Sequence, residues 1–241
     1  MQKCLIVGYG KMGRIHARHL DELGIPWDYH DPFIEGGVAL EPQNYSHVIV
    51  STPLGTHFDV YESLNEFQGS ILIEKPVVIR AEHLHVLLDE RVFPGMIERF
   101  NPVSQLLLNR DITSLHFTRN ASEPPPICDI AIHDIDLAFF ALGDCDWSVH
   151  RVGESKIEGE IGGVPVSFSF KRSVHKKRKC LVNDVDVIDF YKQSYNGEQS
   201  PFVWPVKNEL KCFLADRTCW PDQRLAHLSH EFMIHCSRSA M

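Results

Sequence analysis

The chain has 241 residues, of which 44% are apolar and 23% are charged, and these proportions are ordinary for one or two globular domains. Its formal net charge of −8 argues against a nucleic-acid partner, because phosphates repel an acidic surface on average. The sequence contains no apolar run as long as a membrane span, so we expect no membrane partner either.

The seven cysteines are scattered, include no Cys-x-x-Cys pair, and are odd in number, so they cannot all pair within one chain. This usage is typical of reduced thiols in the cytoplasm. Because a strand-like run begins at Cys4, we expect no signal peptide and a cytoplasmic location. The basic run His175–Lys179 is interpreted as a strand edge or turn, with an anion-binding spot as the alternative.

The first hundred residues alternate predicted strands with predicted helices. The strands are expected at Cys4–Val7, Ile25–His30, His47–Val50, Ile71–Ile73 and Pro94–Phe100, and the helices at Lys11–Leu23, Phe58–Phe67 and Ala81–Glu90. Residues 33–46 are expected to be irregular. This α/β alternation predicts a Rossmann domain with a parallel sheet over residues 1–100. Ligands of such sheets bind at the carboxyl ends of the strands.

The second half has a different order of elements. Helices are expected at Asn101–Asn109, Asp129–Leu142, Val206–Leu214 and Gln223–Cys236, and strands at Ile112–Arg119 and in several stretches between Trp147 and Lys192. This order predicts an α+β domain over residues 101–241, with a mostly antiparallel open sheet.

A glycine-rich motif follows the first predicted strand and opens the first predicted helix. Residues 8–13 read Gly-Tyr-Gly-Lys-Met-Gly, which is the dinucleotide-binding pattern in its expected context. The first glycine permits a tight turn, the second lets the backbone approach a pyrophosphate, and the third lets helix and strand pack closely. The helix N-terminus would face the phosphates. We therefore expect cofactor contacts from Gly8, Gly10, Lys11, Met12 and Gly13, with an accidental glycine-rich turn as the alternative.

Asp31 ends the second predicted strand, about where the acid that binds the adenosine ribose is expected after the glycines. Its carboxylate would accept hydrogen bonds from the ribose hydroxyls and repel a 2′-phosphate. We therefore expect NAD rather than NADP as the cofactor. The alternative is an ordinary loop aspartate.

Four short motifs occur in chain order. They are Gly8-x-Gly10-x-Met12-Gly13-x-x-His16, Ser51-Thr52-Pro53-x-x-x-His57, Glu74-Lys75-Pro76 and Asp129-x-x-x-His133-x-x-Asp136. Together they resemble the glucose–fructose oxidoreductase / inositol dehydrogenase (Gfo/Idh/MocA) family over residues 1–143, and residues 208–213 are similar to its late helix. Residues 98–102 and 129–136 most resemble family members that act on UDP-linked N-acetylated sugars at the 3-position.

The resemblance implies hydride transfer between a nicotinamide and a ring hydroxyl or ketone of a sugar or nucleotide sugar. It assigns Lys75 as the catalytic lysine, which would stabilise negative charge on the reacting oxygen and accept its proton, whereas the alternative is a surface lysine. Asp129 and His133 are four residues apart on one helix face and would assist as orienting group and proton shuttle. The remaining implied cofactor contacts are Ser51, Thr52, Pro53, His57 and Glu74.

Three further residues are expected to contact the substrate: Arg99, Asn101 and Asp136. An inter-domain salt bridge is the alternative for Arg99, and a capping cluster around a core histidine is the alternative for Asp129, His133 and Asp136. Asp134 is expected off their helix face, toward solvent or the other domain. His16 is expected to be structural.

Other histidines do not have metal-binding spacing. His230, Glu231 and His235 miss the His-Glu-x-x-His pattern by one residue, so we expect no metal site. By analogy, an open sheet face predicts a homodimer or homotetramer.

Two functions compete with a sugar dehydrogenase. The short segment after Asp31 and the compressed β-rich half motivate a non-catalytic sensor of dinucleotide and ligand. A reductase of an imine, an amino acid or a linear tetrapyrrole keeps the enzyme class with another substrate.

Overall fold

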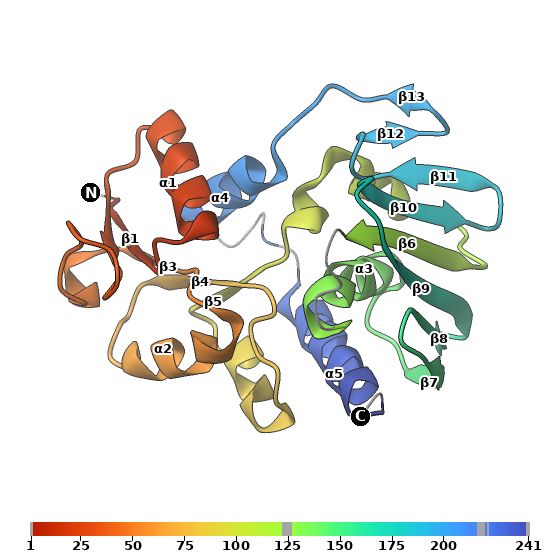
Figure 1. Cartoon of the computed structure of the whole chain (residues 1–241), viewed down its shortest axis with the longest axis horizontal. Coiled ribbons are helices and arrows are strands. Elements are labelled where there is room, and N and C mark those ends of the chain that lie inside the picture. The colour runs from red at the N-terminus through yellow and green to blue at the C-terminus, as the bar shows by residue number, and fades with distance from the viewer. Residues whose placement is uncertain (1, 122–126, 216–219, 221, 240–241) are drawn as a thin grey trace. The chain divides into compact units, whose positions relative to one another are not determined.

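The computed structural model describes residues 2–121, 127–215, 220 and 222–239 (Figure 1). The chain forms two compact units. The first unit is Met1–Gly95 with Val206–Gln223, and the second is Met96–Pro205 with Arg224–Met241. The sequence analysis placed residues 206–223 with the second half. They belong with the first unit because Phe213 packs edge-on against His47 and Phe93, with ring centroids 5.0 and 5.2 Å apart.

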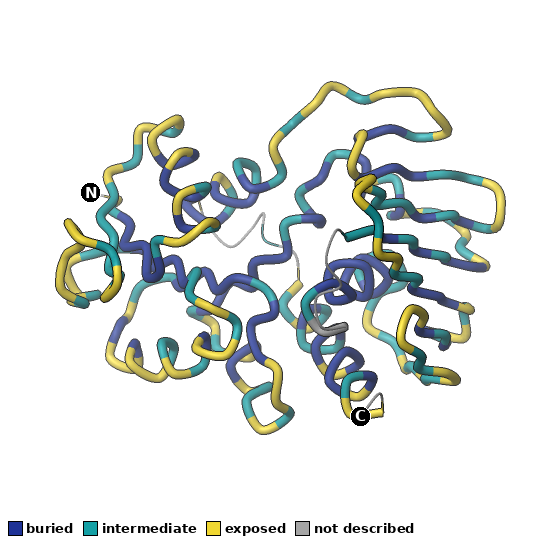
Figure 2. The backbone as a smooth tube through the Cα atoms, viewed as in Figure 1, coloured by how far each residue is buried: buried dark blue, intermediate teal, exposed yellow. Residues whose placement is uncertain are grey.

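The first unit is built on a parallel five-stranded sheet in the order β2-β1-β3-β4-β5. The strands are β1 (Cys4–Val7), β2 (Trp27–His30), β3 (His47–Val50), β4 (Ser70–Glu74) and β5 (Val92–Gly95). The three inner strands are almost entirely buried (Figure 2). A sheet covered on both faces explains why these strands read as continuous apolar runs. The predicted Rossmann topology is confirmed.

In the first unit, the helix predicted at Phe58–Phe67 is shorter than expected and the one predicted at Ala81–Glu90 is a 3₁₀ segment, whereas the first and last helices are present as predicted or slightly longer. The α-helices are α1 (Lys11–Leu23), α2 (His57–Ser63) and α4 (Pro205–Ala215), and the 3₁₀ segments are η1 (Pro42–Asn44), η2 (Leu54–Thr56) and η3 (Ala81–Leu88). Helix α1 has the predicted bounds and ends at Gly24, whose φ of 69° is the left-handed conformation that closes helices. Between β2 and β3 the chain forms only η1, so the irregular segment expected there is present.

The strand predicted over Pro94–Phe100 is wrong. Strand β5 ends at Gly95, and the 3₁₀ segment η4 (Ile97–Phe100) follows, with Glu98 and Arg99 buried. A Cβ atom at Gly95 would lie 3.0 Å from the carbonyl oxygen of Ile73, so β4 and β5 approach closely at this strand end. Charged residues that are buried because tertiary partners neutralise them give no periodic signal in the sequence. The helix predicted at Asn101–Asn109 is also a 3₁₀ segment, η5 (Pro102–Leu107).

The second unit contains an open eight-stranded sheet in the order β13-β12-β11-β10-β6-β9-β8-β7. Its strands are β6 (Leu115–Ala121), β7 (Trp147–Val152), β8 (Lys156–Ile161), β9 (Val164–Arg172), β10 (Lys177–Val182), β11 (Asp186–Asp189), β12 (Ser194–Tyr195) and β13 (Glu198–Gln199). Every pairing is antiparallel except that of β6 with β9. This mixed sheet confirms the predicted α+β class.

Helices α3 (Ile127–Leu142) and α5 (Gln223–Ser239) lie along one face of this sheet (Figure 1). The core between helices and sheet is aromatic, because Phe232 of α5 packs against Phe139, Trp147 and Phe168 with centroids 5.1–6.2 Å apart. The basic run enters β10, where Arg178 and Lys179 pair with Glu98 and Asp189. The run therefore begins in the turn before β10 and continues into that strand, which pairs with β11 and β6 and so lies inside the sheet rather than at its edge.

Candidate functional site

Four loops of the first unit leave the same edge of its sheet. Gly8 follows β1, Asp31 follows β2, Ser51 follows β3, and Lys75 follows β4. Because the strands are parallel, their carboxyl ends share one edge. Strand order reverses between β1 and β3, which is the position where ligands bind in open α/β sheets.

The three glycines of the first loop differ in their surroundings. Gly8 has a φ of 93°, and a Cβ atom there would lie 2.7 Å from the backbone nitrogen of Thr52. A Cβ atom at Gly13 would lie 2.2 Å from the carbonyl oxygen of Gly8. At Gly10, by contrast, no atom of the described chain lies within 4 Å of that position. Packing therefore requires glycine at 8 and 13, whereas Gly10 leaves open space beside the backbone.

The N-terminus of α1 can attract an anion. Gly10 caps the helix without a side-chain hydrogen bond, and the first turn carries no acidic residue. The N–H groups of such a turn have no partner within the helix, and the helix dipole favours negative charge there. Lys11 is exposed in this turn and Met12 is half-buried.

Asp31 is held at the end of β2 by two backbone amides. Its Oδ2 accepts a hydrogen bond from the N–H of Tyr9 at 2.8 Å, and its Oδ1 accepts one from the N–H of Phe33 at 2.9 Å. The Tyr9 ring stacks on Tyr29 at 4.0 Å, and the Arg14 guanidinium lies 4.6 Å from the Tyr9 ring centre. The carboxylate is thus fixed beside the glycine turn, with lone pairs left to accept further hydrogen bonds.

The loop after β3 is tied to the two loops around it. Ser51 Oγ donates to the carbonyl oxygen of Gly8 at 2.7 Å. His57 is buried, and its Nδ1 and Nε2 lie 2.8 and 2.9 Å from the carbonyl oxygens of Pro76 and Thr52. The hydroxyl oxygen of Thr52 is buried and makes no hydrogen bond within the described chain, and Pro53 is exposed. His57 therefore holds the β3 and β4 loops together, while the Thr52 hydroxyl is left for a ligand.

The loop after β4 rests on a buried hydrogen bond between a glutamate and a histidine. Glu74 Oε1 lies 2.7 Å from Nε2 of His16 on α1, and both side chains are buried, so His16 is structural as expected. Glu74 Oε2 accepts a hydrogen bond from the N–H of Lys75 at 3.3 Å. Lys75 itself is half-buried, and the Lys75–Pro76 peptide bond is cis.

One residue near this pair was missed by sequence reasoning. Glu209 of α4 is completely buried, and neither of its carboxyl oxygens has a hydrogen-bond partner within the described chain. Burial, together with the negative charge of Glu74, raises the pKa of Glu209 well above its usual value. A signal was present, because a charged residue occupies the apolar stripe of α4 between Val206 and Phe213.

The second unit pairs two of the residues expected to contact substrate with each other. Arg99 and Asp136 are both buried, and the Arg99 Nε and terminal nitrogen lie 2.6 and 2.5 Å from the two Asp136 oxygens. Ser229 Oγ also donates to Asp136 at 3.1 Å. This salt bridge lies within one unit, and the substrate role of both residues stays a prediction.

Asn101 also forms hydrogen bonds within the second unit. Its Nδ2 donates to the carbonyl oxygen of Phe190 at 2.9 Å and to Glu98 at 3.2 Å, while its Oδ1 accepts from the N–H of Val103. On α3, Asp129 is half-buried and His133 is 6% exposed. Their roles in catalysis stay a prediction.

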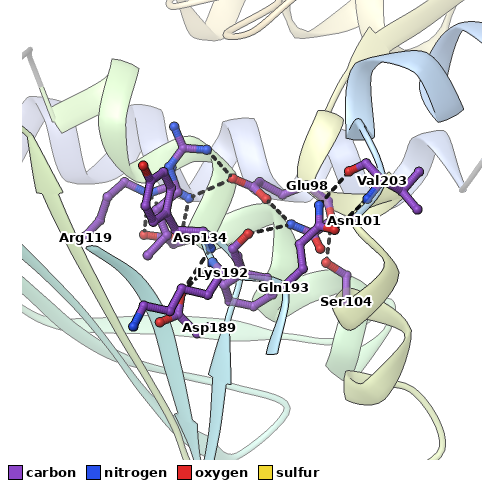
Figure 3. Close-up of polar contacts among 12 residues, drawn as sticks. Glu98, Asn101, Ser104, Arg119, Asp134, Asp189, Lys192, Gln193 and Val203 are labelled. Carbon is purple, nitrogen blue, oxygen red and sulfur yellow. Dashed lines mark hydrogen bonds and ion pairs between the residues drawn. The ribbon is translucent and has the colours of Figure 1, made fainter. Parts of the chain in front are cut away.

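The expectation for Asp134 is wrong. Asp134 is buried and forms a two-pronged ion pair with Arg119 of β6, at 2.6 and 3.0 Å (Figure 3). Glu98 lies 3.7 Å from Arg119 and 2.8 Å from Arg178, which extends the network. The reason is that α3 packs on the sheet, so Asp134 faces a strand that carries a buried arginine.

The histidine-rich last helix has structural contacts. His230 is buried with its Nδ1 2.7 Å from the carbonyl oxygen of Ala226, and His235 packs against Trp147. Among the described residues, no group of three His, Cys, Asp or Glu side chains could hold a metal ion. In the same part of the chain, no helix is long and apolar enough to cross a membrane.

Sequence comparison relates the chain to inositol dehydrogenases, although no protein-family model matches it. It is 23% identical to the myo-inositol 2-dehydrogenase of Thermotoga maritima over 203 residues, which cover 65% of this chain and 60% of that enzyme. It is 25% identical to the scyllo-inositol 2-dehydrogenase (NAD⁺) of Bacillus subtilis over 188 residues, covering 58% and 54%. The chain thus spans little more than half the length of these relatives.

Structure comparison covers nearly the whole chain. The UDP-N-acetylglucosamine 3-dehydrogenase of Acidithiobacillus ferrooxidans superposes with a TM-score of 0.82 at 19% identity, covering 99% of this chain and 97% of that one. A myo-inositol dehydrogenase from Corynebacterium glutamicum superposes with a TM-score of 0.72 at 16% identity, covering 100% and 96%. The four ordered motifs lie on this shared two-domain fold. The chain therefore has the two-domain fold of these dehydrogenases.

The buried Arg99–Asp136 pair gives a stability prediction. Arg99→Ala should lower the free energy of unfolding by about 3–5 kcal/mol, because it leaves the Asp136 charge buried without its cation. Urea unfolding followed by tryptophan fluorescence measures this. Replacing both partners, Arg99→Met with Asp136→Leu, should recover most of the loss.

The control is Arg151→Ala, because the Arg151 side chain is 76% exposed and lies 3.8 Å from Glu158. The free energy of unfolding of this control variant should fall by less than about 1 kcal/mol. Equal losses for Arg99→Ala and Arg151→Ala would contradict the importance given to the buried pair.

Proposed function

We propose that this protein is a nicotinamide-dependent oxidoreductase that acts on a ring hydroxyl or ketone of a sugar or nucleotide sugar. The observation that carries the proposal is the switch-point edge of the first sheet. It combines the open space at Gly10, the uncapped start of α1, the fixed carboxylate of Asp31 and the unpaired buried hydroxyl of Thr52. These features fit a dinucleotide, because each offers backbone access, a positive dipole or a hydrogen-bonding atom to a polar ligand.

The residues that would hold a dinucleotide follow from that edge. Gly8, Gly10 and Gly13 with Lys11 and Met12 would meet its phosphates, Asp31 its adenosine ribose, and Thr52 its other half. When bound, the cofactor supplies a hydride acceptor. Ser51 and His57 fix the loops that would border the cofactor, because their polar atoms are engaged with backbone carbonyls, and their own contact with the cofactor stays a prediction.

Lys75 would do the proton chemistry. Its backbone is anchored to Glu74, and its amine can donate a hydrogen bond to the reacting oxygen, stabilise negative charge there and accept the proton. Asp129 and His133 share a face of α3 and are proposed to assist, as the family resemblance implies. A carboxylate at position 31 would repel a 2′-phosphate, so we propose NAD rather than NADP.

The relatives suggest two substrate classes, cyclic polyols and UDP-linked N-acetylated sugars. The Bacillus relative is named as an NAD⁺ enzyme, and the WlbA dehydrogenase of Thermus thermophilus, with a TM-score of 0.70 at 14% identity and coverage of 98% and 95%, was solved with NAD and UDP-GlcNAcA. We propose the 3-position of a UDP-N-acetylated sugar, because residues 98–102 and 129–136 resemble that subgroup. Assembly as a homodimer or homotetramer and a cytoplasmic location stay predictions.

A ligand-sensing function is the second candidate. It is favoured by the segment between β2 and β3, where a single 3₁₀ turn stands and Gly36 and Gly37 pack against the Tyr29 ring. Turnover of NAD with a panel of inositols and UDP-sugars separates the two functions. Tight NAD binding without turnover on any sugar or reductase substrate would favour the sensor.

The glycines give the first functional prediction. Gly10→Val should fold like the wild type, because its side chain enters open space, but should lose measurable NAD binding by calorimetry. Gly13→Ala is the matched structural variant, and it should lose about 1–3 kcal/mol of stability, since its Cβ would overlap the Gly8 carbonyl. Unchanged NAD affinity in folded Gly10→Val would remove the phosphate site from this loop.

Cofactor choice gives the second prediction. Asp31→Ala should weaken NAD binding about tenfold or more, which is the scale of hydrogen bonds to a charged group. The substitution should also reduce the difference in affinity between NAD and NADP. The exposed Asp111→Ala, which makes the same change of charge in the second unit, serves as control. Tighter binding of NADP than of NAD by the wild type would overturn the assignment.

Catalysis gives the third prediction. Lys75→Ala should lower single-turnover hydride transfer by about 10²- to 10⁴-fold, the contribution of a positioned acid–base group, while NAD still binds. Nicotinamide absorbance follows the reaction at saturating cofactor. Lys171→Ala, which removes an exposed lysine of β9, should react at the wild-type rate. A wild-type rate in Lys75→Ala would take Lys75 out of the mechanism.

A further inference from the structure

Glu209 is a buried carboxyl group in the first unit that the proposed chemistry does not use. Helix α4 buries one face, made of Val206, Glu209, Leu210, Phe213 and Leu214. Glu209 occupies a position in this stripe where an apolar residue would be expected. Helix α1 lies beside α4, since Lys207 pairs with Glu22 at 2.9 Å (Figure 1).

Glu209 has no group within the described chain that could balance a negative charge. It forms no salt bridge there, and no donor lies within hydrogen-bonding distance of either carboxyl oxygen. The charge that acts on it is that of Glu74, a second buried carboxyl group. An isolated buried carboxylate is costly, and two carboxylates at one site do not both ionise readily.

Glu74 has the partners that Glu209 lacks. Its two oxygens face His16 Nε2 and the Lys75 N–H, so its ionised form is the better solvated of the two. The Nδ1 atom of His16 is buried and makes no hydrogen bond within the described residues. A single proton on Nε2, donated to Glu74, therefore satisfies this ring better than two protons.

The other titratable groups packed near α4 do not neutralise Glu209. His47 of β3 touches Phe213, and burial lowers its pKa, which favours the neutral ring. His19 of α1 is buried, and desolvation lowers its pKa in the same way. Lys207 is engaged with Glu22 at the start of α4.

We propose that Glu209 is a positioning residue that keeps a proton at neutral pH and thereby leaves the single buried negative charge on Glu74. Glu74 then stays ionised, accepts from the Lys75 backbone and holds the catalytic loop in one arrangement. Ionisation of Glu209 would place a second charge beside Glu74 and weaken that hold. The effect on Lys75 rests on the proposed function, whereas the proton on Glu209 does not.

The first test measures stability without cofactor. The folded state would keep a proton that the unfolded chain releases above the ordinary glutamate pKa of about 4.3. Wild-type stability should therefore fall, relative to Glu209→Gln, as pH rises from that value toward the raised folded-state value. The unfolding constant of the wild type should increase by up to about tenfold per pH unit against the variant.

The matched control is Glu62→Gln, which removes an exposed carboxyl group of α2 in the same unit. This control should show no widening gap to the wild type with pH. Parallel stability curves for the wild type and Glu209→Gln would overturn the proposal.

A second measurement needs no variant to fold. Infrared spectroscopy of the wild type at neutral pH should show the carbonyl stretch of a protonated carboxyl group, and unfolding in urea at the same pH should abolish it. If Glu209→Gln folds, the band should be missing from it. Absence of the band from the folded wild type would also overturn the proposal.

Kinetics then tests the link to Lys75. The ratio of kcat at alkaline pH to kcat at neutral pH should be higher in Glu209→Gln than in the wild type, because glutamine cannot ionise. An identical pH profile would break the link to the catalytic loop. If stability and infrared results hold but no substrate turns over, the proposed function fails while the buried proton stands.

Discussion

The backbone contact between Gly8 and Gly13 sets the geometry of the first unit. Because Gly13 has no Cβ atom, helix α1 can start directly against the end of β1, and an added Cβ atom would lie 2.2 Å from the carbonyl oxygen of Gly8. That close approach places His16, one turn further along α1, within 2.7 Å of Glu74 on β4. Glu74 in turn anchors the backbone of Lys75. A steric constraint in a glycine turn thus extends through a helix and a buried hydrogen bond to the residue proposed to carry the chemistry.

The two units accommodate buried charge in different ways. In the second unit, each buried carboxylate of α3 has a guanidinium partner, Arg99 for Asp136 and Arg119 for Asp134. Such pairs avoid an uncompensated charge, and their two-pronged geometry fixes α3 on the sheet. In the first unit, Glu74 contacts a histidine and acts electrostatically on the buried Glu209, and neither carboxyl group has a guanidinium partner among the described residues. Retaining a proton is the physical alternative to pairing, and it leaves one net negative charge close to the sheet edge.

The cofactor edge also shows how a short chain can complete a Rossmann sheet. Between β2 and β3 there is one 3₁₀ turn, and the segment is held by local contacts to the β2 aromatic residues. The Tyr29 hydroxyl donates to the carbonyl oxygen of Glu35, and the Tyr9 ring stacks on Tyr29. The Asp31 carboxylate is fixed by the same loop through Phe33. Aromatic stacking and backbone hydrogen bonds therefore hold this segment in place without a longer helical connection.

Local sequence determined the first four strands of the first sheet, the bounds of α1 and the glycine turn, because each depends on short-range periodicity or on the absence of a side chain. Chain order alone indicated that Gly8, Asp31, Ser51 and Lys75 leave one sheet edge, since parallel strands share their carboxyl ends. Only the tertiary structure decided that Val206–Gln223 belongs with the first unit, that β5 ends at Gly95, and that Asp134 is buried. It also decided that Arg99 pairs with Asp136 and that the negative charge of Glu74 acts on Glu209. These outcomes depend on partners 15 to 135 positions away, and no local pattern records whether a charged side chain will find such a partner or be buried without one.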